Sequence, residues 1–127
     1  MASDAPREKA QTPEDIIRLF RQFVAAGDFA GLATLYEDDA VLALPPGQET
    51  HGSAAIAAIF EKLMANRPAG GGSGGESQPV IRNGGLALTS TRLPNGQVTA
   101  EIARQQPDGS WRWVIDQPGI RPASDMQ

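Results

Sequence analysis

The spacing of the apolar residues changes along the chain, and this change limits the fold more than any other feature. In most of residues 12–64, apolar side chains recur every three or four positions, whereas from residue 79 onward they alternate with polar ones. The first period is typical of helices and the second of strands. Helices combined with an antiparallel meander predict an α+β domain, with three helices packed on one face of a curved, mainly antiparallel sheet.

The first helix has the clearest boundaries. Thr12 can cap it with its hydroxyl, Pro13 occupies the first helical position, and two carboxylates follow in the first turn. These residue types are preferred at a helix N-terminus. Gly27 predicts the C-terminal end of the helix.

Two further helices are expected. Asp28 can cap a short second helix, which we expect to continue to Tyr36. The third helix has Ser53 as its candidate cap and apolar residues three or four apart from Ile56 to Met64. Together with the first, these segments make the three helices of the predicted domain.

Five segments have the pattern of strands. A short apolar run at residues 40–44 is ended by Pro45, and four alternating segments follow the glycine-rich stretch. Two breaks carry the residues of tight hairpin turns, Pro94-Asn95-Gly96 and Pro107-Asp108-Gly109. The alternating segments are residues 79–83, 85–93, 97–106 and 110–117.

Residues 70–75 consist of five glycines and one serine, a composition that cannot pack a core. We expect a flexible loop there. The segment looks like a laboratory linker, which leaves open the hypothesis that a native loop was replaced and that the chain is an engineered scaffold. Residues 12–119 are expected to form a single domain, with a mobile tail at residues 1–11 and a C-terminal tail at residues 120–127.

Composition excludes several kinds of function. The chain has no cysteine, so disulfides and cysteine-bound metals are excluded. A net charge of -4 predicts no nucleic-acid partner, and the apolar stretches are far shorter than the about 20 residues that span a bilayer. Residues 1–9 lack the apolar region of a signal peptide, which favours a cytoplasmic protein. The residue spacings indicate neither a metal site nor a cofactor.

Three other features are interpreted as structural. His51 lies in a predicted turn, and we expect it to be solvated. Glu37, Asp38 and Asp39 follow the short helix and are expected to form a solvated turn. The glycine-rich stretch matches the nucleotide-binding and nucleophile-elbow patterns by spacing alone, without the strand and helix that such sites need.

A series of short motifs occurs in this order: Ala26-Gly27-Asp28, Leu35 to Val41, Pro46-Gly47, His51-Gly52, Ala55-Ile56, Phe60, Leu86 to Arg92, Val98 to Arg104 and Gly109 to Asp116. In this order they resemble the SnoaL-like, ketosteroid isomerase-like proteins that share the nuclear transport factor 2 fold. The resemblance covers about residues 12–119. It implies a cone-shaped fold with a pocket between the concave sheet and the helices. It also implies a homodimer that pairs through the outer faces of the sheets.

The ketosteroid isomerases use three catalytic groups, and the resemblance places each of them on this sequence. Their general-base aspartate falls at Leu44, and the tyrosine that donates to the oxyanion falls at Phe20. Their protonated acid falls at Glu101, which can still donate a proton if burial raises its pKa. Steroid isomerisation by that mechanism is not expected, because it needs a base within reach of the carbon. These residues leave open whether the chain is an enzyme.

The same comparison assigns strand faces by alternation. We expect Trp111, Trp113 and Ile115 to face outward, where the tryptophans are either a dimer contact or ordinary packing. The residues expected to point into the pocket are Leu86, Leu88, Ser90 and Arg92, then Thr99, Glu101 and Ala103, then Arg112, Val114 and Asp116.

Asp116 is the most informative polar residue on that surface. It follows the apolar run 113–115, where an unpaired charge is costly, so it must be paired, protonated or reached by solvent. One interpretation is a structural ion pair with Arg92 or Arg112. The other makes Asp116 a base and Glu101 an acid.

The sequence therefore supports two classes of function. The first is a homodimeric protein that binds an apolar, oxygen-bearing small molecule, with isomerase, cyclase or hydrolase chemistry as the enzymatic version. The second is a non-catalytic dimerisation or ligand-sensing module, similar to the association domain of the calmodulin-dependent kinases. The expected binding residues are Phe20, Leu44, Phe60 and Leu88 as walls, with Arg92, Glu101 and Asp116 as polar groups.

Overall fold

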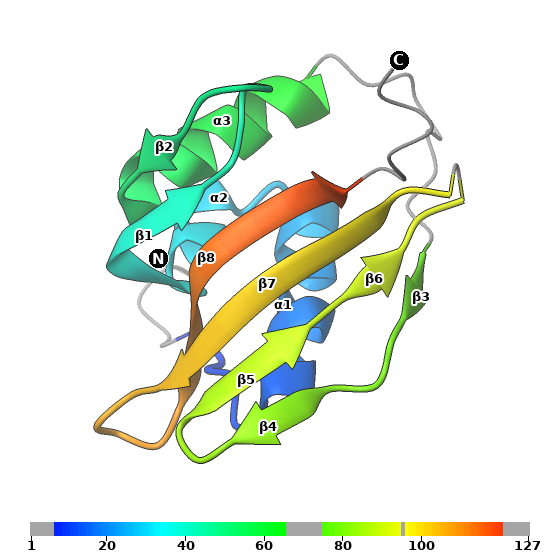
Figure 1. Ribbon diagram of the computed structural model, residues 1–127. Helices are drawn as coiled ribbons and strands as arrows, with labels where there is room; N and C mark the ends of the chain where they lie inside the picture. Colours follow the sequence, from blue (N-terminus) through cyan, green and yellow to red (C-terminus); the bar gives the residue numbers. More distant parts are fainter. Residues whose placement is uncertain (1–6, 66–74, 95, 121–127) are drawn as a thin grey trace.

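The computed structural model describes residues 7–65, 75–94 and 96–120. These residues form three helices and one curved sheet of eight strands, and the helices lie on one side of the sheet (Figure 1). The predicted α+β architecture is therefore confirmed. None of the described helices is long and apolar enough to cross a membrane. The helices are α1 (Pro13–Ala26), α2 (Phe29–Ala33) and α3 (Ser53–Ala65).

The sheet has the strand order β2-β1-β8-β7-β5-β4, and β6 pairs with both β7 and β3. The paired strands are antiparallel except for β1 and β8, which run parallel. The sheet is thus mainly antiparallel, as the sequence predicts. The strands are β1 (Tyr36–Leu42), β2 (Thr50–His51), β3 (Glu76–Ser77), β4 (Ile81–Asn83), β5 (Leu86–Thr89), β6 (Thr91–Arg92), β7 (Val98–Gln105) and β8 (Trp111–Ile120).

The first helix has the boundaries that the sequence predicts. Thr12 accepts a hydrogen bond from the backbone N–H of Asp15, and Gly27 ends α1 with a φ of 70°. This conformation is unstrained for glycine, so the backbone can turn back and satisfy the last carbonyls of the helix. Ile16 and Leu19 on its inward side belong to the hydrophobic core.

The second helix is shorter than predicted. Asp28 caps α2 by accepting from the backbone N–H of Gly31, but the helix ends at Ala33. Tyr36 instead begins β1 and pairs in register with Trp113 of β8. The expected helical position of Tyr36 is therefore wrong, because pairing with a neighbouring strand outweighs a weak local helical spacing.

The three acidic residues after α2 belong to a strand rather than to a turn. Asp38 and Asp39 are exposed, and Glu37 is half-buried. The carboxylate of Glu37 accepts hydrogen bonds from Arg104 at 2.9 Å and Gln106 at 2.8 Å. The expectation of a solvated turn is corrected because β1 pairs with β8 along this stretch of the chain.

The alternating segments form strands close to the predicted ranges. The strands β4 to β7 lie inside three of them, and β8 extends beyond the fourth to Ile120. The turn between β7 and β8 has Gly109 at a φ of 88°, and Asp108 accepts from the backbone N–H of Ser110. Ser53 is the first residue of α3 rather than the cap expected from the sequence.

Residues 7–11 are attached to the domain, which corrects part of the tail expected at residues 1–11. Ala10 is 2% exposed, and its carbonyl accepts a hydrogen bond from the backbone N–H of Trp111 at 2.9 Å. Lys9 also forms an ion pair with Asp108. One small apolar residue among charged ones has no periodicity, so the sequence pattern does not reveal this attachment. The expectations for residues 1–6, 70–74 and 121–127 lie outside the described residues.

Strand register places side chains in rows that run across the sheet. Two inner rows face the helices and are buried except at Arg82, and one outer row lies on the opposite face. The first inner row is Arg82, Ala87, Ala103, Trp113 and Tyr36, and the second is Thr89, Glu101, Asp116 and Leu42. The outer row is Ile81, Leu88, Ile102, Ile115 and Val41.

A β-bulge in β8 decides which residues reach the inner face. Ile102 and Ala103 are consecutive on β7, but their partners Ile115 and Trp113 are two residues apart on β8. The extra residue between them interrupts the alternation of sides. As a result, Trp113 and Asp116 both lie on the inner face although they are three residues apart.

The observed rows correct several expected orientations. Trp111 and Trp113 are buried, not outward-facing. On β5, Ala87 and Thr89 are the buried residues, and the Thr89 hydroxyl lies next to the Trp113 indole, which donates a hydrogen bond to it. The residues that we expected to face inward and that lie outside the inner rows include Leu86, Leu88, Arg112 and Val114.

Candidate functional site

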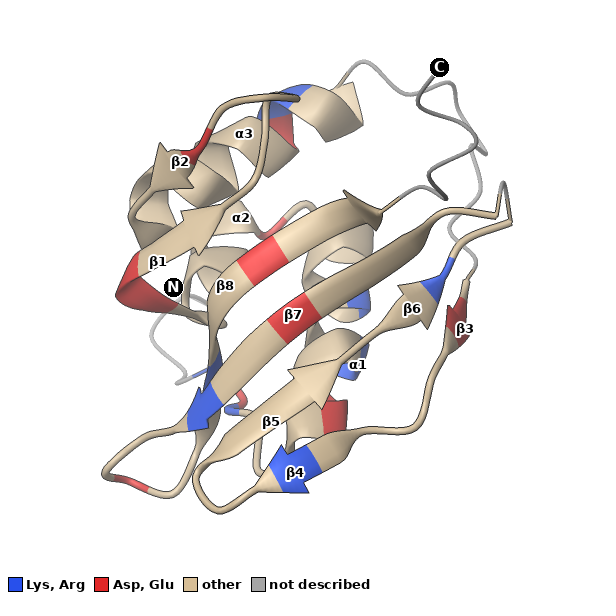
Figure 2. Cartoon of the chain, in the orientation of Figure 1, with Lys and Arg blue, Asp and Glu red and all other residues tan. Residues whose placement is uncertain are grey.

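Two buried carboxyl groups lie next to each other in the middle of the sheet. Glu101 of β7 and Asp116 of β8 are direct register partners, and they are 6% and 4% exposed. In Figure 2, β7 and β8 lie side by side, and each strand carries acidic colour in its middle part. Side chains paired in this way have Cβ atoms about 5 Å apart. Two carboxyl groups at this separation in a buried site interact strongly when they titrate.

Asp116 is held by a tyrosine. The hydroxyl of the fully buried Tyr36 donates a hydrogen bond to Asp116 Oδ2 at 2.5 Å. The other oxygen, Oδ1, has no hydrogen-bond partner among the described residues. Since none of the fully buried side-chain oxygens in this part of the chain lacks a partner, Oδ1 keeps some accessible surface.

Glu101 is held by hydroxyl groups. Thr89, its register partner on β5, donates to Glu101 Oε1 at 2.5 Å. The indole N–H of Trp113 donates in turn to the Thr89 hydroxyl at 3.1 Å. Thr99, two residues before Glu101 on β7, adds a second hydroxyl group that lowers the pKa of this carboxyl group. The five side chains Tyr36, Asp116, Glu101, Thr89 and Trp113 form one connected polar network on the inner face, which we call the carboxyl network.

The environment shifts the proton affinities of this network. Burial and the nearby charge of Glu101 raise the pKa of Asp116 to about 7, and the Tyr36 hydrogen bond opposes this rise. Burial also raises the pKa of Glu101, against the hydrogen bonds of Thr89 and Thr99. Burial and the neighbouring carboxylates raise the pKa of Tyr36 well above its ordinary value, so it remains a donor. Both carboxyl groups therefore hold their protons more tightly than ordinary carboxyl groups do.

Aromatic side chains surround the network. The ring of Phe20 packs 5.2 Å from that of Phe60 and 5.7 Å from that of Trp113, measured between centroids. Phe60 is buried, whereas Phe20 and Leu44 are partly buried against the core. These three residues, expected as apolar walls, lie on or pack against the same core as the network. An apolar surrounding of this kind strengthens electrostatic interactions inside it.

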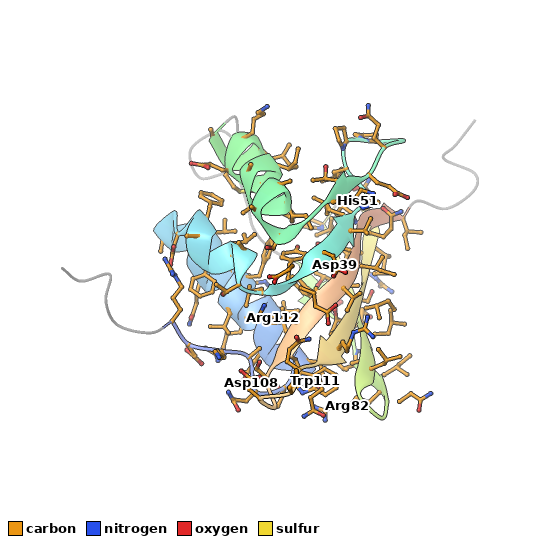
Figure 3. All side chains as sticks on the ribbon, turned by 90° about the vertical axis from the view of Figure 1, so that its left-hand side faces the viewer. Asp39, His51, Arg82, Asp108, Trp111 and Arg112 are labelled. Atoms are coloured by element: carbon orange, nitrogen blue, oxygen red, sulfur yellow. The ribbon has the colours of Figure 1, made fainter. Side chains whose placement is uncertain are left out.

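A cation lies at one end of the inner face. The guanidinium of Arg82 lies 5.5 Å from the ring centre of Trp111, and both residues sit at the end of the sheet away from His51 (Figure 3). Arg82 is also 3.4 Å from Glu14 of α1. The first inner row therefore ends in a cation that lies against Trp111.

Two of the expected binding residues do not join the network. Leu88 belongs to the outer row, and Arg92 is exposed on β6. Among the described residues, neither Arg92 nor Arg112 forms an ion pair with Asp116, and Arg112 lies 4.0 Å from Asp38 instead. The ion-pair interpretation of Asp116 is therefore wrong, because the bulge in β8 puts Arg112 on the other face.

Three members of the network were not predicted. The sequence pattern places Tyr36 in the second helix, so its role is not predicted. The expected alternation assigns the residues of β5 to the wrong faces of the sheet, so Thr89 is not predicted either. Trp113 was assigned to the outer face because simple alternation ignores a bulge. A threonine in register with a glutamate on the next strand is a recognisable signal only once the strand pairing is known.

The described residues offer no metal site. No group of three or more histidine, aspartate or glutamate side chains in the described ranges is arranged to hold a metal ion. His51 is exposed on β2, and its Nε2 lies 3.1 Å from Glu49, in keeping with the solvated position expected for it. The network itself supplies carboxyl, phenol and hydroxyl groups.

The comparisons with known proteins agree with this architecture. The family model described as a SnoaL-like domain matches residues 16–114. No curated protein sequence matches the chain. A candidate association domain of the calcium/calmodulin-dependent protein kinase II type from Thiobacillus denitrificans has 18% identity and a TM-score of 0.70, over 91% of this chain and 100% of its own.

Two further solved structures have the same fold. A candidate ketosteroid isomerase from Shewanella frigidimarina has 13% identity and a TM-score of 0.61, over 81% of this chain and 90% of its own. A candidate dehydratase of the NTF2-like family from Streptomyces avermitilis has 17% identity and a TM-score of 0.62, over 85% of this chain and 94% of its own. Identities this low establish a shared fold rather than a shared activity. Because the family model spans most of the sequence, the chain belongs to the SnoaL-like domain family, with an NTF2-like fold.

Proposed function

We propose that this protein binds a small apolar molecule carrying an oxygen function and catalyses acid–base chemistry on it with Glu101 and Asp116. The observation that carries the proposal is the buried pair of neighbouring carboxyl groups, one of which holds its proton near neutral pH. Strongly shifted carboxyl groups gathered in an apolar surrounding are typical of catalytic sites.

The pair has the groups that an isomerisation requires. The ionised carboxylate takes a proton from a carbon next to a carbonyl group, while the protonated carboxyl donates its proton to the carbonyl oxygen. The resulting enol returns to a ketone when the two transfers run in reverse, at the same carbon or at a conjugated one. For the isomerisation, protons and electrons balance without a further reactant. The same two groups also suit a cyclase, or a hydrolase that uses water as its second substrate.

Access for a ligand is supported on the Asp116 side. Oδ1 of Asp116 keeps accessible surface, whereas Oδ2 is bonded to Tyr36. Phe20 and Leu44, which pack on the core without being fully buried, would form the apolar walls. The ketosteroid isomerase mechanism itself is not proposed, because the base and tyrosine positions of those enzymes fall on Leu44 and Phe20.

The proposal is tested by following deuterium uptake next to the carbonyl of cyclohexanone in D2O by NMR. We expect the protein to accelerate exchange, and Glu101→Gln and Asp116→Asn each to lower the rate at least about tenfold, as is usual for loss of an acid or base. Glu61→Gln, an exposed carboxylate on α3, is the matched control and should match the wild type. A wild-type rate equal to that of the Glu101→Gln, Asp116→Asn double variant would refute the proposal.

A specific observation favours the second candidate, a non-catalytic dimerisation module. The outer row is an uninterrupted line of apolar side chains across five strands, and Ile81 and Ile115 in it are 64% and 50% exposed. The described helices all lie on the other side of the sheet (Figure 1). An exposed apolar line of this length is typical of an interface, and its proposed partner is a second copy of the chain.

Sedimentation measurements test the dimer. We expect the wild type to sediment as a dimer and Ile115→Lys to sediment as a folded monomer. Leu63→Lys is the control, because Leu63 is exposed to a similar extent but lies on α3. A monomeric wild type would refute the dimer. A dimer that accelerates no exchange would favour the assembly module over the enzyme.

A further inference from the structure

The direction of the hydrogen bonds around Thr89 is determined by its partners. The Trp113 indole can only donate, so the Thr89 oxygen accepts from it. The Thr89 hydroxyl must still donate its own proton to an acceptor. Glu101 is its one remaining partner among the described residues. If Glu101 donated to Thr89 instead, the hydroxyl proton of a fully buried side chain would have no acceptor. Thr89 therefore donates to Glu101.

The same reasoning applies to Tyr36. Its hydroxyl contacts Asp116 Oδ2 at 2.5 Å and has no other acceptor among the residues that the structure describes. Being fully buried, it must donate its proton to Oδ2. A proton on Asp116 therefore sits on Oδ1, the oxygen that keeps accessible surface.

The two carboxyl groups differ in the hydroxyl groups that favour their ionised forms. Glu101 accepts a hydrogen bond from Thr89 at 2.5 Å and the Thr99 hydroxyl also lowers its pKa, whereas, in the described part of the chain, Asp116 has the Tyr36 hydroxyl alone. Each donated hydrogen bond favours the ionised form of a carboxyl group. When one charge must be shared between two buried neighbours, the better-solvated group takes it and the other keeps the proton.

We propose that Thr89, oriented by the Trp113 indole, is a positioning residue that keeps Glu101 ionised and leaves the shared proton on Oδ1 of Asp116. The inference rests on the proposed function for its catalytic consequence, since it makes Asp116 the acid and Glu101 the base. These roles are the reverse of those expected from the sequence. The acid then presents its proton from the accessible oxygen, where a ligand oxygen can receive it.

The order of ionisation can be measured without any ligand. Carboxyl ¹³C NMR follows Glu101 and Asp116 separately as the pH is raised, and we expect Glu101 to ionise first. In Asp116→Asn, the Glu101 midpoint should hardly move, because Asp116 is neutral while Glu101 titrates. In Glu101→Gln, the Asp116 midpoint should fall by about one pH unit or more, because its charged neighbour is gone. Equal effects in both variants, or Asp116 ionising first, would overturn the inference.

The role of Thr89 is tested by substitutions that keep its size or its hydroxyl. Thr89→Val removes the donor at nearly constant volume, and we expect the Glu101 midpoint to rise by about one pH unit and the Asp116 midpoint to fall. Thr89→Ser keeps the hydroxyl and should restore the wild-type order. Trp113→Phe should shift the midpoints in the same direction as Thr89→Val. If valine and serine have the same effect, Thr89 has only a packing role.

The two proposals fail separately. Deuterium exchange of cyclohexanone no faster than in the double variant, together with Glu101 ionising first, would refute the proposed catalysis. It would not contradict the assignment of the proton to Asp116. Rapid exchange with Asp116 ionising first would refute the assignment alone. If Thr89→Val does not fold, Glu101→Gln and Asp116→Asn still test which carboxyl group holds the proton.

Discussion

Tyr36 and Trp113 are register partners across the parallel pair of β1 and β8, with ring centroids 5.4 Å apart. The Tyr36 hydroxyl nevertheless bonds Asp116, three residues beyond Trp113. This contact exists because the bulge in β8 returns Asp116 to the face that Trp113 occupies. Each of the two aromatic residues thereby helps to hold one carboxyl group. Tyr36 donates a hydrogen bond to Asp116 directly, whereas Trp113 donates one to Thr89, which in turn donates to Glu101.

The stability of the protein should fall as the pH rises from about 4 to about 7. In this range the folded protein keeps a proton on Asp116, whose pKa is about 7, while the unfolded chain has lost it. Unfolding therefore releases a proton, and the free energy of unfolding decreases with pH by up to about 1.4 kcal/mol per pH unit. Urea unfolding between pH 4.5 and 8 measures this slope.

Two variants show whether Asp116 is responsible for that slope. Asp116→Asn should flatten it, leaving the smaller contribution of Glu101, whose pKa is also raised by burial. Asp38→Asn, at an almost fully exposed position on β1, should leave the slope unchanged. The carboxyl groups of Asp28 and Asp108 have lowered pKa values, so they act with the opposite sign and only at lower pH. An unchanged slope in Asp116→Asn would contradict the prediction.

Removing the Tyr36 hydroxyl should raise the pKa of Asp116 above about 7, because the Tyr36 hydrogen bond now lowers it. Tyr36→Phe also leaves a carboxyl oxygen without its donor, which costs about 1–3 kcal/mol of stability. Carboxyl NMR titration and urea unfolding measure the two effects. In an Asp116→Asn background the same change should cost less, and an equal cost would argue that Tyr36 acts by packing alone.

The inner face next to the tryptophans should tolerate only small residues. Ala103 is fully buried between Ala87 and Trp113 in the first inner row. Ala103→Leu should therefore destabilise the protein by about 1–3 kcal/mol through overpacking. Ala58→Leu, at an exposed position on α3, should change stability by less than about 0.5 kcal/mol. Thermal or urea unfolding of both variants makes the comparison, and equal stabilities would show that the inner face can expand.

Deleting residues 1–10 should cost about 1–2 kcal/mol more stability than deleting residues 1–6. The longer deletion removes the buried methyl group of Ala10 and its hydrogen bond with Trp111, contributions of about 1 kcal/mol each. The ion pair of Lys9 with Asp108 is exposed and adds little. Both truncated chains keep the cap at Thr12. Equal unfolding free energies for the two deletions would show that Ala10 does not anchor the segment.

Much of the fold could be predicted because its signals are local. The cap at Thr12 and the glycine at position 27 set the ends of α1 through neighbouring backbone groups. The alternating segments lie within a few residues of the strands for the same reason. Tyr36 shows the limit of local signals, because a partner strand about 77 residues away decides that it belongs to β1.

The candidate site was predictable in its chemistry but not in its geometry. By itself, the sequence determined the helix ends, the change to alternation and the presence of Glu101 and Asp116 in apolar strands, since these depend on neighbouring residues. Only the tertiary structure decided that the two carboxyl groups pair and that Tyr36, Thr89 and Trp113 hold them. The physical reason is that one extra residue in β8 reverses every side assignment beyond it, and a bulge is set by pairing between strands rather than by local sequence.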